Sequence, residues 1–133
     1  MIHGLAHICF RVRDLAAATD FYCNKLGLKE AFEFTNAEGR RSGLYIHVVG
    51  RTFIELFQGD VVEPLPAQGY KHFCLEVDDV TKTVAELRSR GVDASDPKFG
   101  KDNSWQAWLS DPDGNRIELH SYTPKSWQTP SLK

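Results

Sequence analysis

The sequence predicts an α+β fold built from two βαβββ modules in tandem. Three observations predict it: the two halves of the chain share a series of landmarks, each half holds several short runs that alternate apolar and polar residues, and each half holds one helical pattern. The chain has 133 residues, which is the length of one ordinary domain, so we expect both modules to form one compact domain.

The two halves match at the same kinds of residue in the same order. The histidine that opens the repeat lies 48 residues before a glutamate in the first half, and 46 residues before one in the second half. Landmarks that recur in order at nearly equal spacing indicate a duplication. The matched pairs are His7 with His72, Cys9 with Cys74, Asp14 with Asp79, Gly27 with Gly91, and Glu55 with Glu118.

The first module, residues 1–60, begins with an alternating strand at residues 7–12. Asp14 is a suitable N-cap for a helix whose apolar residues recur at helical spacing, and Gly27 stands where that helix ends. Three further strands are expected at residues 29–35, 43–49 and 52–57.

The second module, residues 70–122, repeats this order. Asp79 caps a helix that ends at Gly91, and a short strand is expected near Val92. Strands at residues 105–110 and 115–122 flank Asp-Pro-Asp-Gly, a strong hairpin turn. Residues 61–69 contain two prolines and one glycine and are expected to form the linker, and residues 123–133 are expected to be a loose tail.

Composition excludes several classes of protein. Hydrophobic residues make up 41% of the chain and charged residues 26%, and the net charge is −2, so nucleic acid is not an expected partner. Apolar runs are too short to span a membrane, and the N-terminus does not resemble a secretory signal. Three widely spaced cysteines suit a reducing compartment, so we expect a cytoplasmic protein.

The recurring histidines and glutamates suggest a metal site. Glu55 lies in an apolar strand, where a buried carboxylate needs a counter-charge or a cation. A lone strand histidine is more often structural, but here both residue types recur at equivalent positions. If a pseudo-twofold axis relates the halves, four side chains converge, and two imidazoles with two carboxylates suit Zn, Ni, Co, Mn or Fe. These side chains are His7, Glu55, His72 and Glu118.

The sequence resembles the vicinal oxygen chelate superfamily, which includes glyoxalase I, bleomycin- and fosfomycin-resistance proteins and extradiol dioxygenases. The resemblance covers residues 2–122 and is carried by His-Ile-Cys-Phe-Arg-Val-Arg-Asp-Leu from His7, by Phe-Tyr before Leu-Gly-Leu, and by Asp-Pro-Asp-Gly-Asn-Arg-Ile-Glu-Leu from Asp111. It implies a cupped, incomplete mixed β-barrel around one divalent metal, with the ligands at the four positions named above.

Two glutamates in the ligand set resemble the glyoxalase I (lactoylglutathione lyase) branch. That resemblance implies a metal-dependent lyase or isomerase that chelates two adjacent oxygens of a small-molecule substrate. Glu55 and Glu118 would then be the catalytic residues and move a proton through an enediolate. Glutathione or another thiol is the implied co-substrate.

Four residues are candidates for substrate binding. Arg11 stands where the glyoxalase I branch has an arginine for the carboxylate of glutathione, although a surface cation is an equal alternative. Lys98, Lys101 and Trp105 belong to a polar loop that is long enough to close over an anionic ligand. The chain departs from the branch after Glu55, where Gln58 stands in a stretch that should hold an asparagine for glutathione.

Other functions within the superfamily remain open. An extradiol-type dioxygenase and a fosfomycin-type transferase use two histidines and one carboxylate, so Glu55 counts against both. A drug-binding module of the bleomycin-resistance kind usually lacks the metal ligands. Open sheet edges in a two-module cup favour a homodimer, in which a second chain covers them.

Overall fold

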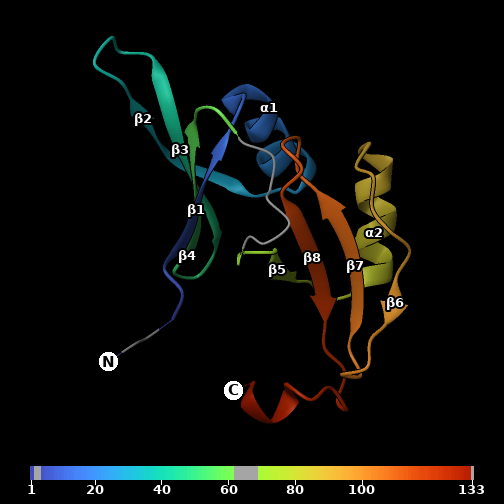
Figure 1. The fold of residues 1–133 in the computed structure, drawn as a ribbon. Coiled ribbons are helices and arrows are strands. Elements are labelled where there is room, and N and C mark those ends of the chain that lie inside the picture. The colour runs from blue at the N-terminus through green and yellow to red at the C-terminus, as the bar shows by residue number, and fades with distance from the viewer. Residues whose placement is uncertain (2–3, 62–68, 133) are drawn as a thin grey trace. The chain divides into compact units, whose positions relative to one another are not determined.

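The computed structural model describes residues 1, 4–61 and 69–132, and the chain divides into two compact units, Met1–Leu65 and Pro66–Lys133. Each unit holds one four-stranded mixed sheet and one main helical segment, which confirms the predicted α+β fold of two βαβββ modules (Figure 1). Among the described residues both sheets are open, and neither closes into a barrel. Most of the predicted linker lies outside the described residues.

In the first unit the strands lie in the order β1-β4-β3-β2. β1 and β4 run parallel, and the other neighbouring strands are antiparallel. The parallel pair follows from the helix that connects β1 to the rest of the sheet, because parallel strands need a crossover. The bounds are β1 His7–Val12, β2 Lys29–Thr35, β3 Arg41–Val49 and β4 Thr52–Gln58.

The predicted first helix consists of two parts. The Asp14 carboxylate accepts a hydrogen bond from Ala16 N (2.8 Å) and starts α1, Leu15–Thr19. A π-helical stretch, η1 Asp20–Lys25, follows, and Leu26 N donates to Phe21 O at 2.9 Å. Gly27 then takes φ +78°, which favours glycine and ends the helix.

The second unit repeats this topology with the strand order β5-β8-β7-β6, in which β5 and β8 are parallel. Near Val92, where a short strand is expected, only a single bridge forms, between Ala94 and Leu109, and the Ala94 carbonyl accepts a hydrogen bond from the Arg88 guanidinium (2.8 Å). The strand itself lies later in the chain. No helix among the described residues is long and apolar enough to span a membrane. The bounds are β5 Phe73–Glu76, α2 Val80–Ser89, β6 Lys98–Phe99, β7 Trp105–Ser110 and β8 Arg116–Ser121.

Each sheet has one face that packs on its helix and one face that carries polar side chains. Strand residues two apart share a face, so the buried aliphatic residues of a strand lie on one face of the sheet and its histidines and glutamates lie on the other. The helix-side face thus forms the core of each unit, and the other face carries the candidate site. The largest buried strand side chains are Leu44, Ile46, Ile54, Leu56, Ile117 and Leu119.

The C-terminal segment, residues 123–132, is not the loose tail that the sequence analysis expects. Ser126 is buried, and its hydroxyl donates to Asn103 O (2.9 Å) and accepts from the Ser104 hydroxyl (2.8 Å). A 3-10 turn, η2 Thr129–Ser131, follows. Hydroxyl groups that hydrogen-bond to a neighbouring loop therefore fix a segment whose composition alone suggests disorder.

Candidate functional site

In the first unit the register of β1 and β4 brings His7 close to Glu55. Cys9 lies directly opposite Glu55, and His7 is two residues earlier, so all three side chains share the face away from the helix. His7 Nε2 lies 3.6 Å from Glu55 Oε2. The Glu55 side chain is 18% exposed, in agreement with the expectation of an at least partly buried carboxylate.

The second unit forms an equivalent pair. Cys74 lies directly opposite Glu118 in the β5–β8 ladder, as Cys9 does with Glu55. His72 directly precedes β5, and its Nε2 lies 3.2 Å from Glu118 Oε2, whose side chain is 15% exposed. Each unit therefore places one imidazole nitrogen beside one carboxylate oxygen, and these are donor types that suit a borderline divalent metal.

Tyr45 orients the histidine of the first pair. Its hydroxyl lies 3.0 Å from His7 Nδ1, and it is opposite Glu55 in the β3–β4 ladder. When Nδ1–H donates to the Tyr45 oxygen, the lone pair of Nε2 faces Glu55 and is free for a metal. The sequence analysis does not identify Tyr45 as a site residue.

Trp108 takes the corresponding place in the second unit. It lies opposite Glu118 in the β7–β8 ladder, and its ring meets the His72 ring edge-on at 4.8 Å. The Arg116 guanidinium lies 4.3 Å from the centre of the Trp108 ring, a cation–π contact. The two units thus support their histidines differently, by a hydrogen bond in one and by ring packing in the other.

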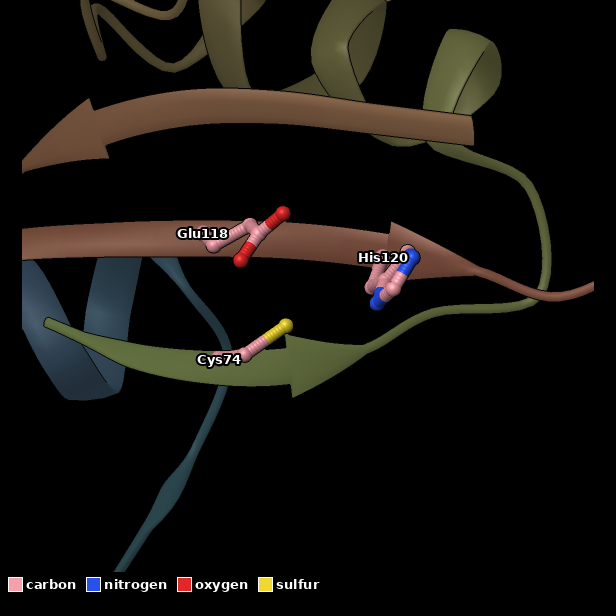
Figure 2. A group of neighbouring side chains, drawn as sticks. All are labelled: Cys74, Glu118 and His120. Atoms are coloured by element: carbon pink, nitrogen blue, oxygen red, sulfur yellow. The ribbon is translucent and has the colours of Figure 1, made fainter. Parts of the chain in front are cut away.

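Glu118 also borders a second imidazole. Figure 2 shows Cys74 on β5 together with Glu118 and His120 on β8, and one donor atom of each lies within 4.8 Å of the others. His120 Nε2 lies 3.4 Å from Asp102 Oδ2. Phe57 takes the place of His120 in the first unit, so this group of three side chains, which could also hold a metal, has no equivalent there.

The two cysteines beside the glutamates are weakly acidic. Burial raises the pKa of Cys9 to about 11, with further contributions from the hydrogen bond and negative charge of Glu55. Burial and the charge of Glu118 raise the pKa of Cys74 to about 12. Although both thiols keep some contact with solvent, they stay protonated at neutral pH, which does not favour a nucleophilic role.

Arg11 and Lys98 lie on the faces that carry the glutamates. Arg11 shares the His7 face of β1 and forms no ion pair with any described residue. Lys98 lies opposite Gln106, which is opposite His120 on β8. Gln58 has another role, because its side-chain oxygen accepts from Leu15 N (3.4 Å) at the start of α1.

Trp105 and Lys101 lie elsewhere. Trp105 is opposite the buried Ser121, so it belongs to the helix-side face, away from Glu118. Lys101 is exposed in the turn before β7. Trp105 therefore does not share the face that carries Glu118 within this unit, and its role in substrate binding stays a prediction.

The loop around Lys101 is fastened to the C-terminal segment. Gln128 Nε2 donates to Asp102 Oδ2 at 2.7 Å, and this hydrogen bond lowers the pKa of the Asp102 carboxyl. Trp127 N donates to the Asp102 carbonyl at 3.0 Å. These contacts hold the loop in place, so it is less free to close over a ligand than its composition suggests.

Comparison with known proteins gives consistent matches. The chain is 25% identical to the fosfomycin resistance protein FosX of Mesorhizobium japonicum, with 92% of this chain and 88% of that protein covered. It is 29% identical to a lactoylglutathione lyase of Neisseria meningitidis serogroup A, with 86% and 88% covered. The crystal structure of SMU.1112c has the same fold, with a TM-score of 0.79, 23% identity, and 90% and 99% coverage.

A family model identifies the common ancestry behind these matches. The model for the Glyoxalase/Bleomycin resistance protein/Dioxygenase superfamily matches residues 4–119, which include both His–Glu pairs. The duplicated βαβββ topology and the equivalent registers of the two parallel strand pairs agree with this match. The chain therefore belongs to the Glyoxalase/Bleomycin resistance protein/Dioxygenase superfamily.

Proposed function

We propose that this protein is a divalent-metal-dependent lyase or isomerase of the glyoxalase type. One ion would be held by both His–Glu pairs, His7 with Glu55 and His72 with Glu118. The observation that carries the proposal is that both units place a histidine Nε2 beside a glutamate Oε2, at 3.6 and 3.2 Å. Lactoylglutathione lyases among the relatives support the same chemistry.

The residues divide the reaction between them. The bound ion, one of Ni, Zn, Co, Mn or Fe, would polarise two neighbouring substrate oxygens and acidify the adjacent C–H bond. One glutamate takes this proton and the other returns it to the neighbouring carbon, so no further reactant is consumed. Arg11 and Lys98 would bind an anionic part of the substrate, and glutathione or another thiol would serve as co-substrate.

The test is a metal and activity assay on the full chain. Protein stripped with a chelator is reloaded with Ni²⁺, Co²⁺, Mn²⁺ or Zn²⁺, and the bound metal is measured by mass spectrometry. Activity is then assayed with methylglyoxal and several thiols. We expect one ion per four-ligand set and isomerase activity with at least one combination of metal and thiol.

Substitution of a histidine outside the proposed ligand set provides the matched control. His7→Ala should lose the metal, whereas His47→Gln should keep it, because His47 Nε2 faces the Gly50 carbonyl at 3.0 Å instead of a glutamate. Binding that survives His7→Ala would contradict the four-ligand set. Stoichiometric metal without activity in any combination would contradict the glyoxalase-type reaction.

Tyr45→Phe is expected to weaken Ni²⁺ or Zn²⁺ binding by about tenfold, because residues that orient a metal-bound histidine typically change affinity by that factor or more. The ring and its packing are kept, so circular dichroism and the melting temperature should change little. Competition with a chromogenic chelator measures the affinity. Tyr70→Phe, at an exposed position in the other unit, is the control. Unchanged affinity in Tyr45→Phe would show that the hydroxyl does not orient His7.

Fosfomycin modification is a second candidate function. It is favoured by the relatives FosX and the metallothiol transferase FosB of Staphylococcus epidermidis, which is 29% identical over 93% of this chain. Because such enzymes use one glutamate, Glu55→Gln should then leave metal binding intact. Fosfomycin consumption, measured by mass spectrometry with water or a thiol as nucleophile, separates the two functions.

We further propose a homodimer in the cytoplasm. Cys9, Cys23 and Cys74 are free thiols, which suits a reducing compartment. Sedimentation velocity on the full chain tests the oligomeric state, and a monomer at micromolar concentration would contradict it.

A further inference from the structure

A cavity of about 630 Å³ lies in the first unit, at the end of the sheet where β1 and β4 begin. We call it the edge cavity, and it is lined by residues 4–6, Tyr45 and residues 50–53. Two hydrogen bonds join its walls, from Thr52 Oγ1 to Leu5 O (3.0 Å) and from Phe53 N to Ala6 O (2.9 Å). Its volume is within the range of small-molecule sites.

The edge cavity opens beside the first His–Glu pair. Ala6 precedes His7, and Phe53 is two residues before Glu55 on the same face of β4. Tyr45 belongs both to the cavity wall and, through its hydroxyl, to the His7 hydrogen bond of 3.0 Å. A ligand in the cavity would therefore place its nearer end beside His7 and Glu55.

Aromatic rings continue from the cavity across the face that carries Glu55. The Tyr45 ring stacks on Phe32 with centroids 4.6 Å apart and planes at 16°, and it lies 5.0 Å from Phe53. Gly43 leaves room for this arrangement, because a Cβ there would come within 2.7 Å of the Phe57 ring. Partly exposed rings on the site face favour a flat, unsaturated ligand. These rings belong to Phe32, Phe34, Tyr45, Phe53 and Phe57.

The charge of the cavity points to an anion. Arg51 is exposed in the lining and forms no ion pair or side-chain hydrogen bond with any described residue. No aspartate or glutamate is among the described residues that line the cavity. A guanidinium without a partner is well suited to a carboxylate, which it can bind through two parallel hydrogen bonds.

We propose that the edge cavity selects the substrate, and that the substrate is a flat aromatic acid. Its ring packs against Tyr45 and Phe53, its carboxylate binds Arg51, and its reacting oxygens reach the His7–Glu55 pair. The reacting end rests on the proposed function, whereas the ring and the carboxylate rest on the cavity alone.

The experiment is calorimetric titration of the metal-free full chain with three probes. 2-Naphthoate has the flat ring and the charge, decahydronaphthalene-2-carboxylate keeps the charge without the flat ring, and 2-naphthamide keeps the ring without the charge. We expect 2-naphthoate to bind about fivefold more tightly than the saturated acid, from ring packing. We expect it to bind roughly tenfold more tightly than the amide, from the contact with Arg51.

Two variants locate the binding. Phe53→Leu should remove the preference over the saturated acid, and Arg51→Gln should remove the preference over the amide. Arg40→Gln, an exposed arginine outside the cavity lining, should change neither preference. Equal binding of all three probes, no binding, or preferences that neither variant alters would overturn the proposal. Because the titration uses no metal, its result does not depend on whether the protein has the proposed glyoxalase-type activity. Failure of the titration likewise leaves the test of that activity unaffected.

Discussion

Replacing Glu118 by glutamine is expected to reduce kcat by roughly a thousandfold, the range that general acid–base residues contribute. Glutamine is nearly isosteric, but it can neither take nor return a proton, and it supplies no negative charge to a cation. Since the Glu118 side chain is 15% exposed and lies 3.2 Å from His72 Nε2, water cannot easily replace it. The assay uses whichever metal and thiol give activity with methylglyoxal.

Metal content distinguishes the two ways in which this variant can fail. Glu86→Gln is the matched control, because Glu86 lies on α2 and pairs with Arg90 on the outside of the same unit. If Glu118→Gln keeps the ion but loses turnover, Glu118 is the proton carrier, and if it loses both, it is first of all a ligand. Wild-type turnover with a bound ion would refute the mechanism with two glutamates.

The topology and both His–Glu pairs could be predicted because the duplication presents the same series of strands, helix, histidine and glutamate twice in one chain. Cys9 opposite Glu55 and Cys74 opposite Glu118 occupy the same position in their ladders, although the spacing from cysteine to glutamate differs by two residues. The segments between the strands accommodate these two residues, and the alternation of side chains along the strands keeps each cysteine and its glutamate on one face. Local rules for caps also hold, since Asp14 and Asp79 both start helices.

Tyr45 could not be predicted because a β-bulge changes the face on which it lies. Regular pairing from Val49 opposite Thr52 would set Ile46 opposite Glu55 and place Tyr45 on the core face. The structure has a register shift between His47 and Val49, which sets Tyr45 opposite Glu55 instead. A shift of one residue reverses every side chain beyond it, and sequence alone does not show where a bulge falls.

The face on which Trp105 lies could not be predicted for the same reason, a change of register. A four-residue turn at residues 111–114 would set Trp105 opposite His120, on the face of Glu118. In the structure Asn115 belongs to the turn, because Asp111 N donates to Asn115 O at 3.0 Å and Gly114 takes φ +82°. The strand then starts at Arg116, so Trp105 faces Ser121 and Trp108 faces Glu118.

The C-terminal segment could not be predicted because its order depends on partners in another part of the sequence. The Ser126 hydroxyl accepts from the Ser104 hydroxyl and from Thr123 N, both at 2.8 Å, and donates to Asn103 O. Ser104 is itself fully buried, and the Ser126 hydroxyl is one acceptor for its hydroxyl. Composition describes only the polarity of such a segment, whereas its stability follows from groups that would otherwise be buried without partners.

Ser126→Ala is therefore expected to lower the free energy of unfolding by about 3 kcal/mol, because it removes the three hydrogen bonds that the buried Ser126 hydroxyl forms with Ser104, Thr123 N and Asn103 O. The corresponding fall in Tm is roughly 10 °C for a chain of this size. Chemical denaturation monitored by tryptophan fluorescence measures it. Ser131→Ala is the control, since Ser131 lies in the same segment, is exposed, and has no side-chain hydrogen bond among the described residues. Equal stability of the two variants would mean that water replaces the Ser126 hydroxyl, and that the segment contributes little to the second unit.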